Sequence, residues 1–199
     1  ALDPAGKYGD QAVRDALSGR HGTRTMTYRY DRLSKDNTFI EPIDFVVKGS
    51  VSNNALADIK RTAKFTILDR GSINYLQDRI RPWARLRMPD GGFVEWSLGV
   101  FILSTPGRTL SEGGVVSRNV DAYDPLLALQ QDKVIDRYSI LEGTLYTDAI
   151  NDLADDFTFA RSITPSPLAL TVTMEWEPGT TKLRILNDLL AAINYQSAS

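Results

Sequence analysis

Apolar and polar residues alternate through the first two thirds of the chain, which is the pattern of strands with one buried face. The clearest case is the run in which Ala63, Phe65 and Ile67 alternate with lysine and threonine. Because no helical pattern separates these segments, a split or Greek-key β-barrel is favoured over an alternating α/β sheet. The segments that we predict as strands on this basis are Thr23–Tyr30, Ile40–Val51, Ile59–Leu68 and Val115–Tyr123.

A β-hairpin is predicted between Trp83 and Leu103. Apolar residues alternate with arginines up to Met88, and Pro89–Gly92 then supplies a turn in which glycines can adopt positive φ. Phe101 and Leu103 lie opposite the main apolar face of the return strand, which indicates that both faces are covered at this end. That main face comprises Val94, Trp96, Leu98, Val100 and Ile102.

Helical patterns replace the strands in the last third of the chain. Asp124 and Pro125 are typical of the first positions of a helix, Asp124 as the N-cap and Pro125 just after it. Further on, Gly143-Thr144 and Gly179-Thr180 each precede an amphipathic pattern, and each pair is followed by Asn-Asp-Leu at the same distance. Two copies at an offset of 36 residues do not make a solenoid array. The similarity is either an internal repeat or that of two helices with similar N-caps.

Three segments follow from these patterns. Residues 1–22, polar and rich in glycine, are expected to form a flexible N-terminal arm with a short helix around Asp10–Leu17. Residues 23–133 are expected to form a β-barrel domain. Residues 134–199 are expected to be a helix-containing segment that leads into a second, incomplete domain, because the last helix has no closing element after it. The fold class is therefore mainly β with α additions, or α+β.

Composition excludes several classes of protein. Hydrophobic residues make up 42% and charged residues 24% of the chain, which is ordinary globular composition rather than disorder. The net charge of −2 argues against a dedicated nucleic-acid binder, which carries a clustered basic excess. The absence of cysteine excludes disulfides, thiol nucleophiles and Cys-ligated zinc. No apolar run approaches the ~18 residues of a membrane span.

The sequence offers little catalytic chemistry. His21 is the single histidine and lies in the glycine-rich arm, where a solvated imidazole is the simplest interpretation. Asp155 and Asp156, like Glu41 and Asp44, are carboxylate pairs of the solvated kind. No phosphate-binding glycine loop is present. We therefore predict no catalytic residue, no cofactor and no metal site, and a protein that acts by assembly rather than as an enzyme.

Four arginines on the predicted hairpin and just before it are the most suggestive charge feature: Arg79, Arg81, Arg85 and Arg87. Trp83 lies among them, so the cluster has the composition of an aromatic and basic nucleic-acid surface. Arg85 and Arg87 also alternate with the apolar face of the hairpin, which makes an exposed, solvated face the simplest interpretation. A protein interface comes next, since arginine is favoured at interfaces, and a nucleic-acid surface comes last. The three tryptophans lie in or near predicted strands, where tryptophan usually belongs to the core.

The order of several segments resembles the tail-hub, or baseplate-hub, proteins of tailed bacteriophages, especially those of actinobacterial siphophages. The resemblance covers roughly residues 40 to 195 and depends on order and spacing rather than on one diagnostic motif. The segments that carry it are Gly49–Thr66, Asp78–Trp83 with Leu98–Ser104, Val120–Leu126, and Gly179–Thr180 with Ile185–Tyr195.

This resemblance implies a minor tail protein of the virion tail tip, assembled in the host cytoplasm. It implies a homotrimeric ring of split β-barrels that joins the tail tube or distal tail protein to tape-measure, fibre and tip proteins. Phage DNA would pass through the lumen, and no part of this segment would insert in a membrane. Members of the family have no catalytic residues to transfer. Two alternatives stay open: a carbohydrate- or receptor-binding β module on a virion or cell surface, and a hydrolase domain of the tail tip.

Overall fold

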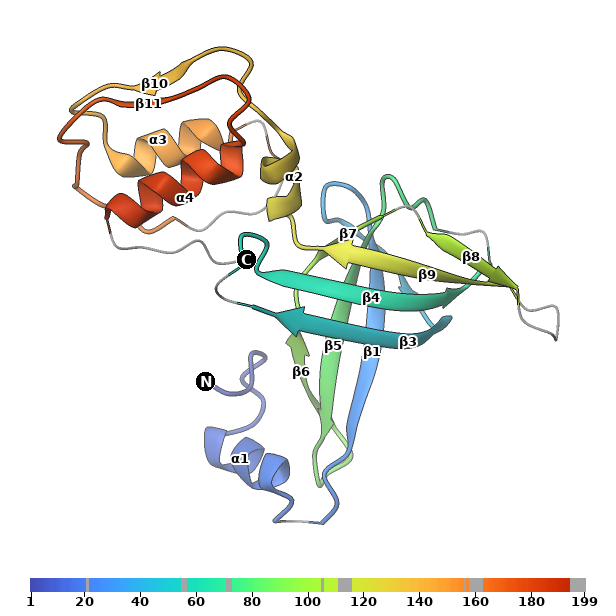
Figure 1. Ribbon diagram of the computed structural model, residues 1–199. Helices are drawn as coiled ribbons and strands as arrows, with labels where there is room; N and C mark the ends of the chain where they lie inside the picture. The colour runs from blue at the N-terminus through green and yellow to red at the C-terminus, as the bar shows by residue number, and fades with distance from the viewer. Residues whose placement is uncertain are drawn as a thin grey trace. The chain divides into compact units, whose positions relative to one another are not determined.

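The alternating segments of the sequence fold as strands in the computed structural model of the chain (Figure 1). The structure describes residues 1–20, 22–54, 57–70, 73–104, 106–110, 116–155, 157 and 163–193. The expectations for His21, for a strand start at Val115, for Asp156 and for the end of the last helix lie outside the described residues. The chain divides into two units, Ala1–Val51 with Ala63–Ala122 and Ser52–Thr62 with Tyr123–Ser199, and each is considered by itself below.

Strands dominate the first unit, and helices accompany a short sheet in the second. The elements are, in chain order, α1 (Asp10–Ser18), β1 (Met26–Leu33), β2 (Phe39–Ile43), β3 (Val46–Asn53), β4 (Arg61–Leu68), β5 (Arg79–Arg87), β6 (Phe93–Ser97), β7 (Phe101–Leu103), β8 (Gly107–Leu110), β9 (Val116–Tyr123), α2 (Leu126–Gln131), β10 (Tyr138–Ile140), α3 (Tyr146–Leu153), β11 (Met174–Trp176) and α4 (Lys182–Ala192). This confirms a mainly β fold with α additions.

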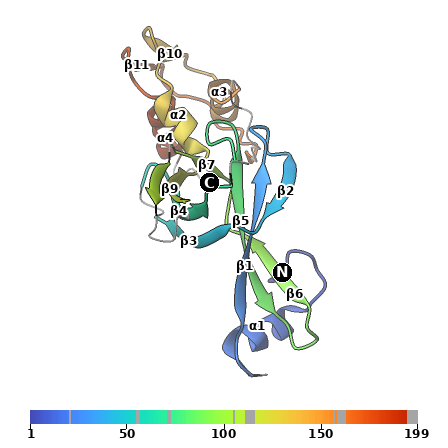
Figure 2. The same ribbon diagram turned by 90° about the vertical axis from the view of Figure 1, so that its right-hand side faces the viewer.

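The strands β1 to β9 form one sheet in the described residues, in the order β2-β1-β5-β7-β9-β4-β3, with β6 on β5 and β8 on β9. β3, β4 and β9 run across the direction of β1, β5 and β6 (Figures 1 and 2). The two ends of this order, β2 and β3, do not pair with each other, so the described strands do not form a closed barrel. The single strand expected over Ile40–Val51 is in fact two, β2 and β3, which Asp44 and Phe45 separate.

The predicted hairpin is confirmed in its first half and corrected in its second. β5 pairs with β6 from Trp83↔Ser97 to Arg87↔Phe93. Gly99, with φ of 117°, then interrupts the return strand, and the chain resumes as β7, which pairs with the start of β5. The glycine changes which residues face inward, so Phe101 is fully buried while Ile102 is partly exposed.

Two separate cores fix the sheet of the first unit. One gathers around Phe65, whose ring meets Phe101 and Tyr30 edge to face at centroid distances of 6.2 and 5.9 Å. Ala63 and Ile67, predicted to share its face, are buried beside it. The other core lies under α1 and is described next.

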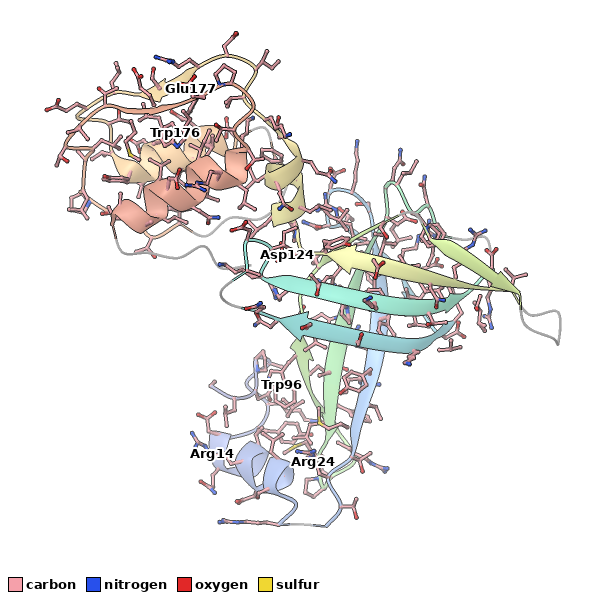
Figure 3. All side chains as sticks on the ribbon, viewed as in Figure 1. Arg14, Arg24, Trp96, Asp124, Trp176 and Glu177 are labelled. Atoms are coloured by element: carbon pink, nitrogen blue, oxygen red, sulfur yellow. The ribbon has the colours of Figure 1, made fainter. Side chains whose placement is uncertain are left out.

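α1 confirms the short helix expected in the N-terminal segment. Its buried residues Val13 and Ala16 pack on Leu86 and Val94 of β5 and β6. Trp96 lies close to α1 in Figure 3, and its Nε1–H donates a hydrogen bond to the carbonyl oxygen of Leu2 at 2.8 Å. Residues 2–17 thus pack on the sheet, a feature that the glycine-rich sequence did not indicate.

In its described residues the second unit consists of a two-stranded antiparallel ribbon and three helices. α2 begins at Leu126, one residue later than predicted, and Pro125 precedes its first residue. Asp124 Oδ1 accepts a hydrogen bond from the backbone N–H of Leu126 at 2.9 Å, as a capping side chain does. Leu126 and Leu129 of this helix are buried in the same core as the ribbon and the two later helices. This packing explains why the longer stretch of this unit begins at Tyr123, eleven residues before the boundary expected from the sequence.

The ribbon and helices of the second unit repeat one motif. β10 and β11 are each followed by a turn with a glycine of positive φ, 85° at Gly143 and 87° at Gly179, and then by a helix. The buried positions also match at the offset of 36 residues, as Ile150 and Leu186 show. The helices α3 and α4 do not share a cap residue type, since Leu145 precedes one and Thr181 the other. The structure therefore favours an internal repeat over similar N-caps.

Candidate functional site

One face of β1, β5 and β6 carries arginines together with acidic side chains. The simplest interpretation of the sequence was a row of arginines exposed to solvent. Strand alternation puts Arg81, Trp83, Arg85 and Arg87 on the face opposite the α1 core. The antiparallel register then places partners beside them from the neighbouring strands. We call this surface the arginine face and define it by Arg29, Asp31, Arg81, Trp83, Arg85, Arg87 and Glu95.

Asp31 lies at the centre of the arginine face. Its side chain is only 3% exposed, and Arg29 and Arg81 both form ion pairs with it, at 2.6 Å from Arg29 Nη1 to Oδ1 and 3.1 Å from Arg81 Nη2 to Oδ2. Trp83 is the third donor residue, and its Nε1–H donates a hydrogen bond of 2.7 Å to Oδ2. A buried carboxylate needs such donors, because removing one ion from water costs on the order of several kcal/mol in free energy.

Glu95 extends the ion-pair network onto β6. Arg29 Nη2 donates to Glu95 Oε2 at 2.9 Å, and the hydrogen bonds from Arg29 lower the pKa of the Glu95 carboxyl. The same hydrogen bonds, together with those to Asp31, raise the pKa of Arg29. Arg29 therefore bridges two carboxylates that stand on two different strands.

Arg85 contacts Glu95 without ideal hydrogen-bond geometry. Its Nε lies 2.6 Å from Glu95 Oε1, yet the N–H points off the oxygen, so this buried nitrogen has no well-directed acceptor among the described residues. The guanidinium also lies over the ring of Phe93, at 4.0 Å from the centroid. Charge attraction and ring contact, rather than a directed hydrogen bond, hold this side chain.

Trp83 is the aromatic centre of the same face. The guanidinium carbons of Arg29 and Arg81 lie over its ring, at 4.5 and 4.9 Å from the centroid. A tryptophan with two cations over its rings and its N–H bonded to Asp31 is held in one orientation. Trp83 is partly exposed and so departs from the usual place of tryptophan in the core, whereas Trp176 is buried.

The four arginines singled out in the sequence do not act alike. Arg81 and Arg85 belong to the network, whereas Arg79 donates to the side-chain oxygen of Asn37 at 2.9 Å. Burial lowers the pKa of Arg79. Arg87, at the end of β5, is the exposed member. The simple picture of one solvated row therefore fits Arg87 and not the other three.

Sequence reasoning missed Arg29, Asp31 and Glu95. Each alternates with residues on the other face of its strand, so a period of two was present for them as well. The contacts that join the three strands, however, link residues far apart in the chain: Asp31 and Arg81 are 50 positions apart, and Arg29 and Glu95 are 66 apart. A local pattern carries no information on such a pairing.

A pocket of about 220 Å³ lies elsewhere on the first unit, next to Tyr75 and Phe45. Its Arg118 is paired with Asp69, at 2.7 Å from Nη2 to Oδ2, and the guanidinium of Arg70 lies 5.5 Å from the centroid of Phe45. The described residues that line it include no histidine. In the part of the chain that the structure describes, no group of three or more histidine and acidic side chains could hold a metal ion.

No helix among the described residues has the length and apolar character needed to cross a bilayer. No protein-family model and no curated protein matches the sequence. Similarity is found in three dimensions, where the chain matches two phage tail proteins and a chain of the Francisella PdpA–VgrG complex.

The fold is that of phage tail proteins. The structure of a tail protein from Neisseria meningitidis MC58 matches with a TM-score of 0.55 at 13% identity, over 83% of this chain and 45% of that one. The 43 kDa tail protein of prophage MuSo2 from Shewanella oneidensis matches with a TM-score of 0.54 at 11% identity, over 83% and 48%. A chain of the Francisella PdpA–VgrG complex gives 0.50 at 13% identity, over 92% and 30%. The chain thus spans less than half the length of each.

Proposed function

We propose that this chain is a structural part of a phage tail, in which it acts as a ring-forming hub at the tail tip and not as an enzyme. The observation that carries the proposal is the shared fold with two phage tail proteins, each matched over 83% of this chain. The order of sequence segments that resembles tail-hub proteins gives independent support. In this role the strands of the first unit form a split β-barrel of the tail-hub type.

The hub is a homotrimer that joins the tail tube or distal tail protein to tape-measure, fibre and tip proteins, within a virion assembled in the host cytoplasm. Phage DNA passes through its lumen, and the net charge of −2 suits this role because a basic lumen would retain the phosphates. A closed ring needs two different, complementary patches on each subunit. We take the phage to be of the actinobacterial siphophage type.

The arginine face supplies one of these patches. Arginine and tryptophan are the residues most often found at the energetic centre of protein interfaces, and Trp83 is already held rigid here. Arg87 is the exposed cation of this face, and Arg79 lies at the other end of the same strand. An acidic patch on the neighbouring copy would complement them.

The test is the mass of the full-length protein in solution, combined with electron microscopy. Three copies per particle and a ring with a central opening are expected. Arg87→Glu should weaken assembly, whereas Arg14→Glu, an exposed arginine on α1, should leave it intact. A strictly monomeric protein that does not join tail tubes would overturn the hub.

The alternative of a carbohydrate-binding module gains no support from Trp83. Sugars stack on the open face of an aromatic ring, and two guanidinium groups already lie over this ring. Its Nε1–H is also engaged, by Asp31.

A further inference from the structure

The two halves of the ribbon in the second unit are related by a pseudo-twofold axis. Ser139 pairs with Glu175, which is 36 residues later, so this pair lies on the axis. The β-bridge Lys133↔Thr181 is equivalent to the β-bridge Leu145↔Ala169, because Lys133 corresponds to Ala169 and Leu145 to Thr181 at the offset of 36 residues. The ribbon therefore has two equivalent ends, one in each copy of the motif (Figure 1).

The backbone hydrogen bonds at the two ends match one for one. Gly143 N–H donates to the oxygen of Leu170, and its counterpart Gly179 donates to that of Val134, each at 2.8 Å. Tyr146 N–H donates to Leu168 and, at the other end, Lys182 N–H to Asp132, at 3.1 and 2.9 Å. The return bonds from Leu170 to Thr144 and from Val134 to Thr180, at 2.9 and 3.0 Å, complete the correspondence.

The side chains at these two ends have diverged. At the end that joins residues 141–146 to 168–173, four apolar side chains are exposed: Leu141 at 66%, Leu145 at 36%, Leu168 at 50% and Val172 at 63%. The equivalent positions at the other end hold polar residues: Glu177, Thr181, Asp132 and Asp136. One exposed apolar side chain, Ile135 at 89%, also lies at that end, and its counterpart is Thr171. We call the first set the apolar end. Because the polar end has the same backbone, the motif itself does not require apolar side chains at these four positions.

Charge separates the two ends as well. The polar end carries charges of both signs, and two ion pairs form there: Lys182 with Asp132 at 2.9 Å and Arg137 with Glu177 at 2.8 Å. At the apolar end the charged side chain is Glu142, and Asp148 follows in the first turn of α3; both are exposed and acidic, and within the described residues neither forms an ion pair.

We propose that the apolar end is a docking surface for a segment of another protein whose apolar side chains are flanked by lysine or arginine. Exposed apolar residues that a closely matched backbone does not need are most simply explained by a partner that covers them. Glu142 and Asp148 then complement the flanking cations. A symmetric contact between two copies is disfavoured, since it would bring these like charges together.

Two synthetic amphipathic helices test the surface on the full chain. Both carry the same leucine face, and the polar face is all lysine in one and all glutamate in the other. The lysine peptide should bind more tightly, and the NMR shifts it causes should concentrate at residues 141–148 and 168–173. Equal binding of the two peptides, or shifts spread over other surfaces, would overturn the proposal.

Matched double variants complete the test. Leu141→Ser with Val172→Ser should raise the Kd of the lysine peptide about tenfold or more, because two large apolar contacts are lost. Asp136→Ser with Glu177→Ser changes the equivalent positions of the polar end and should leave the Kd unchanged. Equal effects of the two double variants would contradict the proposal. Sedimentation shows whether the unmodified chain self-associates. If it does, and only the first double variant abolishes the self-association, the surface binds a second copy of this chain instead. None of these outcomes depends on the ring proposed above.

Discussion

Trp83 donates its indole N–H to Asp31 across the β1–β5 pair, at 2.7 Å from Nε1 to Oδ2. Asp31 is the most buried charge of the arginine face, and Arg29 and Arg81 complete its environment. A carboxylate with three donors is well stabilised, but each donor depends on it in return. The stability of this face therefore rests on one acidic residue.

Asp31→Asn should lower the free energy of unfolding by about 3 kcal/mol, as expected when one partner of a buried ion pair is removed. The amide keeps the shape but leaves Arg29 and Arg81 without their shared anion. Denaturant unfolding measures the change. Asp121→Asn is the control: its ion pair with Lys64 is exposed on both sides and should contribute within about 0.5 kcal/mol. A loss of similar size in both variants would contradict the role of Asp31.

Glu95→Gln should reduce stability by about 2 kcal/mol at neutral pH, since charged hydrogen bonds from Arg29 are lost. The difference should depend on pH. The folded-state pKa of Glu95 lies below its ordinary value of 4.5, so its stabilisation is complete above pH 4.5 and is lost as the pH falls through the folded-state pKa. Unfolding curves of both proteins between pH 7 and pH 3 should therefore converge at the acid end. A gap of constant size would show that the Arg29 contact does not act through this carboxyl.

The internal repeat makes a prediction of its own at its two turns. Gly143→Ala and Gly179→Ala should each destabilise the protein by about 1 kcal/mol, because both glycines have positive φ while nothing lies near the added Cβ. Thermal or denaturant unfolding should give nearly equal values for the two. Gly107→Ala is the control, since that glycine also has open space but no positive φ, and its substitution should be neutral or slightly stabilising. Clearly unequal values for Gly143 and Gly179 would argue against equivalent turns.

Local sequence patterns were sufficient to predict features that depend on a single strand or helix. Alternation predicted β4 and its buried residues, and residue type predicted the cap of α2 at Asp124. The break at Gly99 was missed because the apolar alternation continues through it, and only the positive φ reveals the change of face. The arginine face was predicted only in part, since its carboxylates come from strands whose pairing depends on the whole sheet. Likewise the offset of 36 residues was visible, but the exchange of the two copies about Ser139 and Glu175 requires the register.

The packing of α1 on the first unit can be tested by two neighbouring residues that point in opposite directions. Val13 is fully buried against Leu86 and Val94, whereas Arg14 lies exposed on α1 (Figure 3). Val13→Ala should cost about 2 kcal/mol, because it removes buried methyl groups and leaves a cavity. Arg14→Ala should cost nothing measurable, since alanine is the better helix former. Denaturant unfolding gives both values, and hydrogen exchange of the α1 amides should accelerate for Val13→Ala alone. If neither variant changes stability or exchange, the helix does not contribute to the core of the first unit.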